Sequence, residues 1–184
     1  YNSDIKIDLN KNKIHALTKT NDDLINAKIT LADTGLNSDT GERIRRIKEH
    51  INKNETFMMT YGDGLSDINL KKLLNFHKKN KKMVTVTAVR PPARFGVLKF
   101  KGNRVSYFKE KSKLDEGWIN GGFFVMEPNF LKLIKHDKTF LEKEPLEKVT
   151  KTKNLVAYKH KKFWQCVDTK RDLDKIRKIF KKKF

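Results

Sequence analysis

The feature that most constrains the fold is a short apolar run that ends in a turn holding one carboxylate. The run Thr56–Tyr61 has the length and the β-branched and aromatic content of a buried strand. Gly62 and Gly64 interrupt it with Asp63 between them, and an apolar spacing typical of a helix begins after Asp67. We therefore expect Asp63 at the C-terminal end of a central strand, just before a helix, where open α/β sheets bind ligands.

The carboxylate of Asp63 has two interpretations. Asp-Gly after a strand is a common tight turn, and taken alone this favours a turn residue over a metal ligand. A carboxylate beside glycines is also suited to hold a hard cation through oxygen. Asp168 is a second candidate, because it follows the apolar run Phe163–Val167 and precedes an expected helix.

Asp63 and Asp168 gain weight as a pair. The carboxyl ends of parallel strands meet at the same edge of a sheet, so the two carboxylates could converge on one Mg²⁺. For either residue alone, capping of the following helix is the simpler interpretation. The five histidines lack the spacing of metal ligands, and Cys166 is expected to be a buried structural thiol rather than a nucleophile.

Strands alternate with helices along the chain, with one hairpin turn at residues 101–103. This order predicts an α/β fold with a mainly parallel sheet flanked by helices and one antiparallel hairpin, in a single domain over residues 1–184. Strands are expected at 5–7, 27–32, 56–61, 83–89, 95–100, 104–108, 118–126, 155–160 and 163–167. Helices are expected at 41–50, 68–77, 128–136, 145–149 and 171–184.

Charge bounds the choice of partners. The formal net charge is +20, from 42 Lys and Arg against 22 Asp and Glu, which is typical of proteins that bind polyanions. The lysines are scattered through every helix and loop without a nucleic-acid motif. We therefore expect most of them to lie on solvated faces, and binding of phosphate-bearing small molecules to account for part of the positive charge. No apolar run approaches the roughly 18 residues of a membrane span, so we expect no membrane partner. The single cysteine predicts a cytoplasmic protein without an internal disulfide. The sequence leaves open whether the protein forms a homo-oligomer.

The loop Asp33–Gly41 is rich in Gly, Ser, Thr, Asn and Asp. Its backbone N–H groups and hydroxyls suit phosphate, sugar or base edges. The same composition is typical of any loop that caps a helix.

A series of motifs occurs in a fixed order: Asp33-Thr34-Gly35, Thr40-Gly41 with Arg43, Thr60-Tyr61-Gly62-Asp63-Gly64, Arg94-Phe95-Gly96, Glu110-Lys111, Asn120-Gly121-Gly122-Phe123-Phe124-Val125 and Phe163-Trp164-Gln165-Cys166-Val167-Asp168-Thr169. With these motifs nearly the whole chain resembles the glucose-1-phosphate cytidylyltransferases. These are sugar-nucleotide pyrophosphorylases of the nucleotidyltransferase superfamily. The resemblance implies a Rossmann-like fold of the nucleotide-diphospho-sugar transferase type. It also implies formation of CDP-glucose and pyrophosphate from CTP and glucose 1-phosphate, by in-line attack on the α-phosphate.

The resemblance also implies roles for particular residues. The catalytic Mg²⁺ is expected on Asp63 and Asp168. The nucleotide is expected on Ser38, Thr40, Arg43 and Gly62. The sugar phosphate is expected on Glu110, Lys111, Asn120 and Gly121. CDP-glucose leads toward dideoxy sugars of surface polysaccharides, such as the O-antigen of lipopolysaccharide.

Two departures from the family pattern set further expectations. Glu110-Lys111-Ser112 stands where the family has Glu-Lys-Pro. The family's glycine-rich Gly-Gly-x-Gly-Thr-Arg loop does not occur, and its strand and helix would precede Tyr1. We therefore expect a fragment that lacks the first βα unit and binds CTP unproductively. The alternatives are a pyrophosphorylase for UTP, dTTP or GTP, an inactive remnant with an interaction role, and a basic nucleic-acid-binding module.

Overall fold

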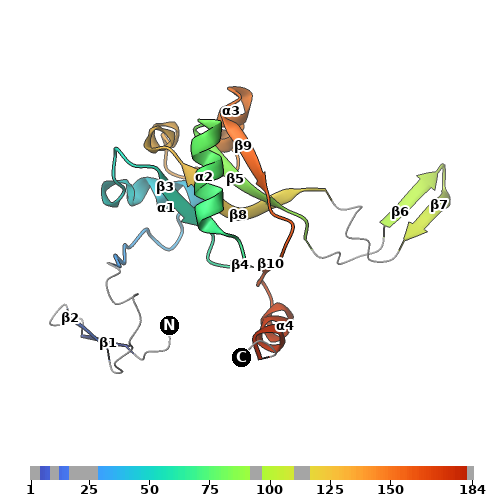
Figure 1. The fold of residues 1–184 in the computed structure, drawn as a ribbon, viewed down its shortest axis with the longest axis horizontal. Coiled ribbons are helices and arrows are strands. Elements are labelled where there is room, and N and C mark those ends of the chain that lie inside the picture. The colour runs from blue at the N-terminus through green and yellow to red at the C-terminus, as the bar shows by residue number, and fades with distance from the viewer. Residues whose placement is uncertain (1–4, 9–12, 17–28, 92–96, 110–116, 182–184) are drawn as a thin grey trace. The chain divides into compact units, whose positions relative to one another are not determined.

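The computed structural model describes residues 5–8, 13–16, 29–91, 97–109 and 117–181 (Figure 1). The expected motifs Arg94-Phe95-Gly96 and Glu110-Lys111 contain residues outside these ranges. The chain divides into two compact units, residues 1–33 and residues 34–184, and each is described by itself.

The first unit contains one antiparallel strand pair. β1 (Ile5–Asp8) pairs with β2 (Lys13–Ala16), and Ile5 lies opposite Ala16. The prediction of a strand over residues 27–32 is wrong for its described part, because residues 29–32 form no strand. Ile29 and Leu31 are 65% and 77% exposed. Their alternation with polar residues resembled a strand, but no described residue pairs with them.

The second unit is built on a four-stranded sheet in the order β3-β8-β5-β9. The strands are β3 (Phe57–Thr60), β8 (Ile119–Met126), β5 (Val84–Val89) and β9 (Leu155–Lys159). β5 and β9 are parallel, and β8 runs antiparallel to both of its neighbours. β3, β5 and β9 therefore share one direction, which confirms the predicted mainly parallel sheet, with β8 as the reversed strand.

Two smaller strand pairs accompany this sheet. β6 (Val97–Lys101) and β7 (Arg104–Lys109) form the predicted antiparallel hairpin, and the positive φ of Gly102 (59°) suits its tight turn. β4 (Gly64–Ser66) pairs antiparallel with β10 (Trp164–Cys166).

The β4–β10 pair corrects two details of the prediction. Asp63 does not directly precede a helix, because β4 intervenes and the helix starts at Leu70. The strand before Asp168 pairs with β4 and not with the central sheet. Isolated three-residue strands have no periodicity of their own, so the sequence pattern merged β4 with the loop before the helix.

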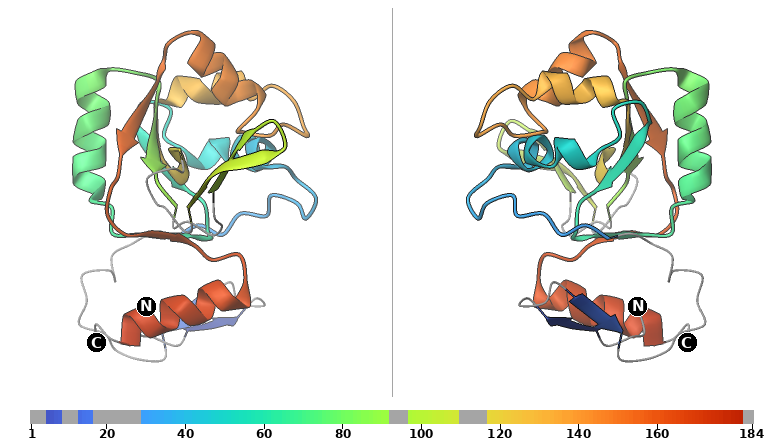
Figure 2. Two further views of the ribbon diagram at one scale, coloured as in Figure 1. Left: turned by 90° about the vertical axis from the view of Figure 1, so that its right-hand side faces the viewer. Right: turned by 90° about the vertical axis from the view of Figure 1, so that its left-hand side faces the viewer.

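Helices lie on both faces of the sheet (Figure 2). α2 (Leu70–Asn80) lies against one face, and α1 (Thr40–Arg46) and α3 (Glu144–Lys151) lie on the other. Two 3₁₀ segments, η2 (Lys48–His50) and η3 (Pro128–Leu133), and helix α4 (Lys170–Lys181) complete the unit. The helix expected over 128–136 is thus a shorter 3₁₀ segment. No helix in the described ranges is both long and apolar enough to cross a membrane.

The core lies between the sheet and the helices α1 and α3. Phe124 and Met126 of β8 are fully buried there with Val84 of β5. On the α2 face, Thr85 is buried and its hydroxyl lies 2.8 Å from Nδ1 of His77. β5 therefore faces the apolar core on one side and makes a polar contact with α2 on the other.

Candidate functional site

Asp63 and Asp168 lie together although they come from distant parts of the chain. One ligand atom from each of Asp63, Cys166 and Asp168 lies within 4.8 Å of the other two. The pairing of Gly64 with Cys166 brings the two segments together, and the Val167 N–H donates to the Asp63 carbonyl at 2.9 Å. The predicted convergence is therefore present, but an antiparallel pair produces it and not the ends of parallel strands.

Helix capping does not explain these two carboxylates. The side chain of Asn69 caps α2 by accepting the Lys72 N–H at 2.8 Å. Thr169 serves α4, because its Oγ1 accepts the Asp172 N–H at 3.2 Å. Asp63 lies in the turn between β3 and β4, and its side chain is exposed.

Cys166 is the member of this cluster that the sequence pattern did not reveal. Its Sγ donates to Oδ1 of Asp168 at 2.9 Å, and the residue is half-buried. Burial and the neighbouring carboxylates of Asp168 and Asp63 raise the pKa of the thiol to about 12. The prediction of a buried thiol is therefore wrong in its burial, because the residue is only half-buried, whereas a protonated thiol is a poor nucleophile. Its place two residues before Asp168 in an extended segment was the available signal, since such residues share a face.

The donor set of this cluster fits a hard divalent cation. Both carboxylates are exposed, and within the described part of the chain neither has a cationic side chain at ion-pair distance. Two carboxylate oxygens with open positions beside them suit Mg²⁺, which keeps waters and takes phosphate oxygens as further ligands. The neutral thiol is not a ligand of this class.

Most residues expected at the nucleotide line one cleft with Asp63. The cleft has a volume of about 600 Å³, and its walls include Thr40, Arg43 and Gly62 together with Asp63. Ser38 is not among the lining residues, and its hydroxyl donates to the carbonyl of Thr34. The structure thus brings the loop after residue 33 next to the Tyr-Gly-Asp-Gly turn.

Arg43 fastens this loop. Its guanidinium donates to Oγ1 of Thr34 at 2.9 Å and to the Leu36 carbonyl at 3.0 Å. Asp39 precedes α1 without a side-chain capping bond, so capping does not account for the polar composition at that position. The loop is held by an arginine that also faces the cleft, which suits contact with an anion.

Glu142 connects the two walls of the cleft, and no sequence motif pointed to it. Its Oε2 accepts from the Thr40 hydroxyl at 2.8 Å, and its Oε1 accepts from the Tyr61 hydroxyl. Burial, followed by the contact with Glu142, raises the pKa of Tyr61 above its usual range. Asn120 approaches the same hydroxyl at 3.5 Å and lines an adjacent cavity with Glu142.

The residues expected at the sugar phosphate are only partly described. Glu110 and Lys111 lie outside the described ranges. Gly121 is packed against β5, where a Cβ atom would lie 2.8 Å from Cγ1 of Val89. Its carbonyl accepts the indole N–H of Trp164 at 2.8 Å. Asn120 lies near Tyr61, and Gly121 lines neither cavity.

Comparisons with known proteins identify the family to which the chain belongs. The family model described as nucleotidyl transferase matches residues 5–182. Glucose-1-phosphate cytidylyltransferase of Salmonella typhimurium is 45% identical over 144 residues, which are 78% of this chain and 56% of that enzyme. Mannose-1-phosphate guanylyltransferase 1 of Arabidopsis thaliana is 33% identical over 137 residues, which are 67% of this chain and 38% of that protein.

A solved structure supports the fold. UDP-glucose pyrophosphorylase complexed with UDP-glucose superposes with a TM-score of 0.59 at 17% identity, covering 82% of this chain and 65% of that one. At this identity the likeness concerns the fold only. The chain spans little more than half the length of the Salmonella enzyme.

Proposed function

We propose, from the premise that this chain belongs to the nucleotidyl transferase family, that it serves the transfer of a cytidylyl group from CTP to glucose 1-phosphate. The products are CDP-glucose and pyrophosphate. The observation that supports this most is the cleft that joins Thr40, Arg43 and Gly62 to Asp63, with Asp168 beside it. The 45% identity to a glucose-1-phosphate cytidylyltransferase supports the choice of substrates.

The reaction needs alignment and charge neutralisation more than a reactive side chain. A phosphate oxygen of glucose 1-phosphate attacks the α-phosphorus of CTP in line. The new P–O bond forms as the bond to the bridging oxygen of pyrophosphate breaks, and pyrophosphate leaves with that electron pair. Asp63 and Asp168 would hold Mg²⁺, which supplies neutralisation of phosphate charge when bound.

Other residues of the cleft have binding roles in this proposal. Arg43 lies where it can contact an anionic part of the nucleotide while it keeps its loop closed. Glu142 fixes Thr40 and Tyr61 relative to each other, so it links the loop that carries Thr40 to the turn that carries Asp63.

A second candidate is a pyrophosphorylase for another nucleoside triphosphate. The 33% identity to a mannose-1-phosphate guanylyltransferase favours this alternative. Competition between CTP, UTP, dTTP and GTP in the pyrophosphate-release assay separates the two. We also propose a cytoplasmic location and a role in carbohydrate biosynthesis toward lipopolysaccharide O-antigen, both on the resemblance described above.

The test compares pyrophosphate release from CTP and glucose 1-phosphate with Mg²⁺ in three full-length proteins, which are the unaltered protein, Asp63→Asn and Asp174→Asn. Asp63→Asn should lower the rate by about 100-fold or more, because an aligned electrostatic contact to the reacting phosphates is lost. Asp174→Asn is the matched control, since Asp174 is an exposed carboxylate on α4 whose contact with Arg177 is long, at 3.8 Å. It should keep the rate of the unaltered protein. An Asp63→Asn rate equal to that control would refute the assignment.

A further inference from the structure

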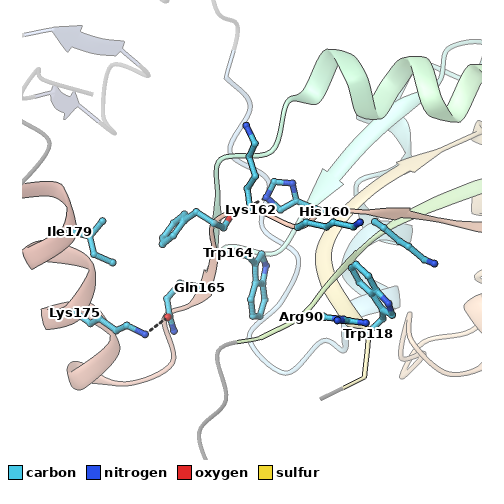
Figure 3. A pocket seen from close by; sticks show the side chains of 11 residues that line it. Arg90, Trp118, His160, Lys162, Trp164, Gln165, Lys175 and Ile179 are labelled. Carbon is cyan, nitrogen blue, oxygen red and sulfur yellow. Dashed lines mark hydrogen bonds between the residues drawn. The ribbon is translucent and has the colours of Figure 1, made fainter. Parts of the chain in front are cut away.

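A separate cavity lies where the carboxyl ends of β5 and β9 meet the start of β8 (Figure 3). Its volume is about 710 Å³. Arg90 follows β5 and Trp118 precedes β8, and the pairing of Val89 with Ile119 places these two side by side. The remaining walls come from residues 159–165, which run from the end of β9 into β10, and from α4. Asp63, Cys166 and Asp168 do not line it, so it is separate from the proposed metal site.

The cavity is strongly positive. None of its eleven lining residues is acidic, and five are basic, namely Arg90, Lys159, Lys161, Lys162 and Lys175. Across the described ranges none of these five lies within 4.0 Å of a carboxylate. Lys175 donates to Oε1 of Gln165 at 2.9 Å, which holds one ammonium group at the cavity wall. Uncompensated cations around a concave surface attract anions.

The cavity is also aromatic. Both tryptophans of the chain, Trp118 and Trp164, line it and are half-buried. The Arg90 guanidinium lies 4.9 Å and the Lys159 ammonium 5.5 Å from the centre of the Trp118 ring. The indole N–H of Trp164 is bonded to the Gly121 carbonyl, so that ring is held in place. Fixed aromatic rings offer flat apolar faces on which a base or sugar ring stacks.

We propose that this cavity binds a small phosphate ester that carries a ring, either a nucleoside phosphate or a sugar phosphate. The cations meet the phosphate and the aromatic side chains meet the ring. The volume is in the range of small-molecule sites, which are about 300–1,000 Å³. This site goes beyond the proposed reaction, because none of its residues is a candidate metal ligand and its ligand needs no Mg²⁺.

The competing explanation is the general lysine richness of the chain. Lys71 and Lys72 on α2 represent that background, because they are exposed neighbours that do not line this cavity. Lys161 and Lys162 are also exposed neighbours but line the cavity. Reversing either pair changes the net charge equally, so the two double variants separate a site from a diffuse charge effect.

The experiment uses tryptophan fluorescence, because both tryptophans lie at the cavity. The 184-residue chain is titrated in EDTA with cytidine 5′-monophosphate and with glucose 1-phosphate. Cytidine and glucose are the arms without phosphate, and a single-stranded oligonucleotide is the nucleic-acid arm. The titrations are repeated with Asp63→Asn, with Lys161→Glu/Lys162→Glu, and with Lys71→Glu/Lys72→Glu.

We expect a saturable fluorescence change with at least one phosphate ester and none with cytidine or glucose. Asp63→Asn should bind equally well, so failure of the proposed reaction would leave this result intact. Lys161→Glu/Lys162→Glu should weaken binding about tenfold or more, because charge-assisted contacts to phosphate are lost. Lys71→Glu/Lys72→Glu should change it by less than about twofold, as expected of screened distant charges. The ester that binds more tightly shows whether the natural ligand is a nucleoside phosphate or a sugar phosphate.

Three results would overturn the proposal. One is the absence of saturation with both esters. Another is equal weakening by the two lysine double variants. A third is tighter binding of the oligonucleotide than of either ester, which would assign the face to nucleic acid. If Lys161→Glu/Lys162→Glu fails to fold, Trp118→Leu, followed through the remaining Trp164 signal, tests the aromatic half, and unchanged affinity there would equally overturn it.

Discussion

Replacement of Asp63 by asparagine should stabilise the metal-free protein and abolish its stabilisation by Mg²⁺. The two opposite effects follow from one geometry. Asp63 and Asp168 hold their carboxylates within 4.8 Å of each other without a nearby cation in the described structure. Without a metal they repel, and with a metal both attract it. Asp63→Asn removes one charge while it keeps the size and shape of the side chain.

The magnitude follows from the distance. The two carboxylates lie no more than 4.8 Å apart. At that upper limit, two unit charges repel by about 3.5 kcal/mol at an effective dielectric constant of about 20 and by about 0.9 kcal/mol at about 80. Because both carboxylates are exposed, the aqueous value applies, so the free energy of unfolding should rise by about 1 kcal/mol. For a chain of this size that corresponds to a Tm increase of about 2–4 °C. Mg²⁺ at about 100 times its Kd should add about 2.7 kcal/mol to the unaltered protein only.

The assay is thermal unfolding in EDTA and in a series of Mg²⁺ concentrations. The control Asp174→Asn should follow the unaltered protein in both conditions. A lower Tm of Asp63→Asn in EDTA would contradict the repulsion, and a Mg²⁺-dependent shift of the usual size in that variant would contradict the metal assignment. Each half of the reasoning therefore has its own refutation.

Three further predictions concern the thiol, the core and acid stability. Cys166→Ser should leave the Mg²⁺ shift in Tm unchanged but weaken Cd²⁺ binding in calorimetry, because sulfur prefers the softer ion; loss of the Mg²⁺ shift would make the thiol side chain essential. Phe124→Ala should cost about 3–5 kcal/mol in urea unfolding because Phe124 is fully buried, whereas Phe100→Ala at a 62% exposed site should cost less than about 0.5 kcal/mol; equal costs would misplace the core. Burial alone would raise the pKa of Glu127, but hydrogen bonds from His77 and Thr56 lower it overall. The stability that ionised Glu127 provides is complete above its unfolded pKa of about 4.3 and is lost as pH falls through the lower folded pKa. The Tm difference between the unaltered protein and Glu127→Gln should thus shrink on acidification, and a growing difference would contradict this sign.

Local patterns predicted most of the second unit. Val84–Val89 is a β-branched run bounded by a proline pair, and it forms β5 within one residue of its expected start. The turn at residues 101–103 carries enough information to define the β6–β7 hairpin, because glycine at a positive φ closes it. Such elements depend on neighbours in sequence, so a single sequence suffices to find them.

Pairing between distant segments was not readable in the same way. β4 and β10 are three residues long and gain their strand geometry only from each other. Residues 29–32 show the reverse case, a strand-like pattern without a partner strand in the described structure. Alternating apolar residues indicate that a segment fits a sheet, but the partner decides whether it forms a strand.

In the candidate site, too, residues within a local sequence pattern were predicted and a residue defined by distant contacts was missed. Asp63 and Asp168 were found because each follows an apolar strand, although the reason for their convergence was wrong. Glu142 was missed because its partners Tyr61 and Thr40 are 81 and 102 residues away, and the loop that carries it has no motif. A hydrogen-bonded carboxylate in an irregular loop leaves no periodic trace, so only the folded chain reveals it.

β10 belongs to both of the sites inferred from this structure. Trp164 and Gln165 line the lysine-rich cavity, and Cys166 and then Asp168 lie at the proposed Mg²⁺ position. Among the described strands β10 pairs with β4 only, and β4 directly follows Asp63. If a ligand in the cavity displaces this short strand, Asp168, which lies two residues beyond it, should move as well. Linkage makes such an effect reciprocal, so a phosphate ester that changes Mg²⁺ affinity must have its own affinity changed by Mg²⁺ by the same factor. Equal ester affinities with and without Mg²⁺ would then show that β10 holds both sites rigidly and independently.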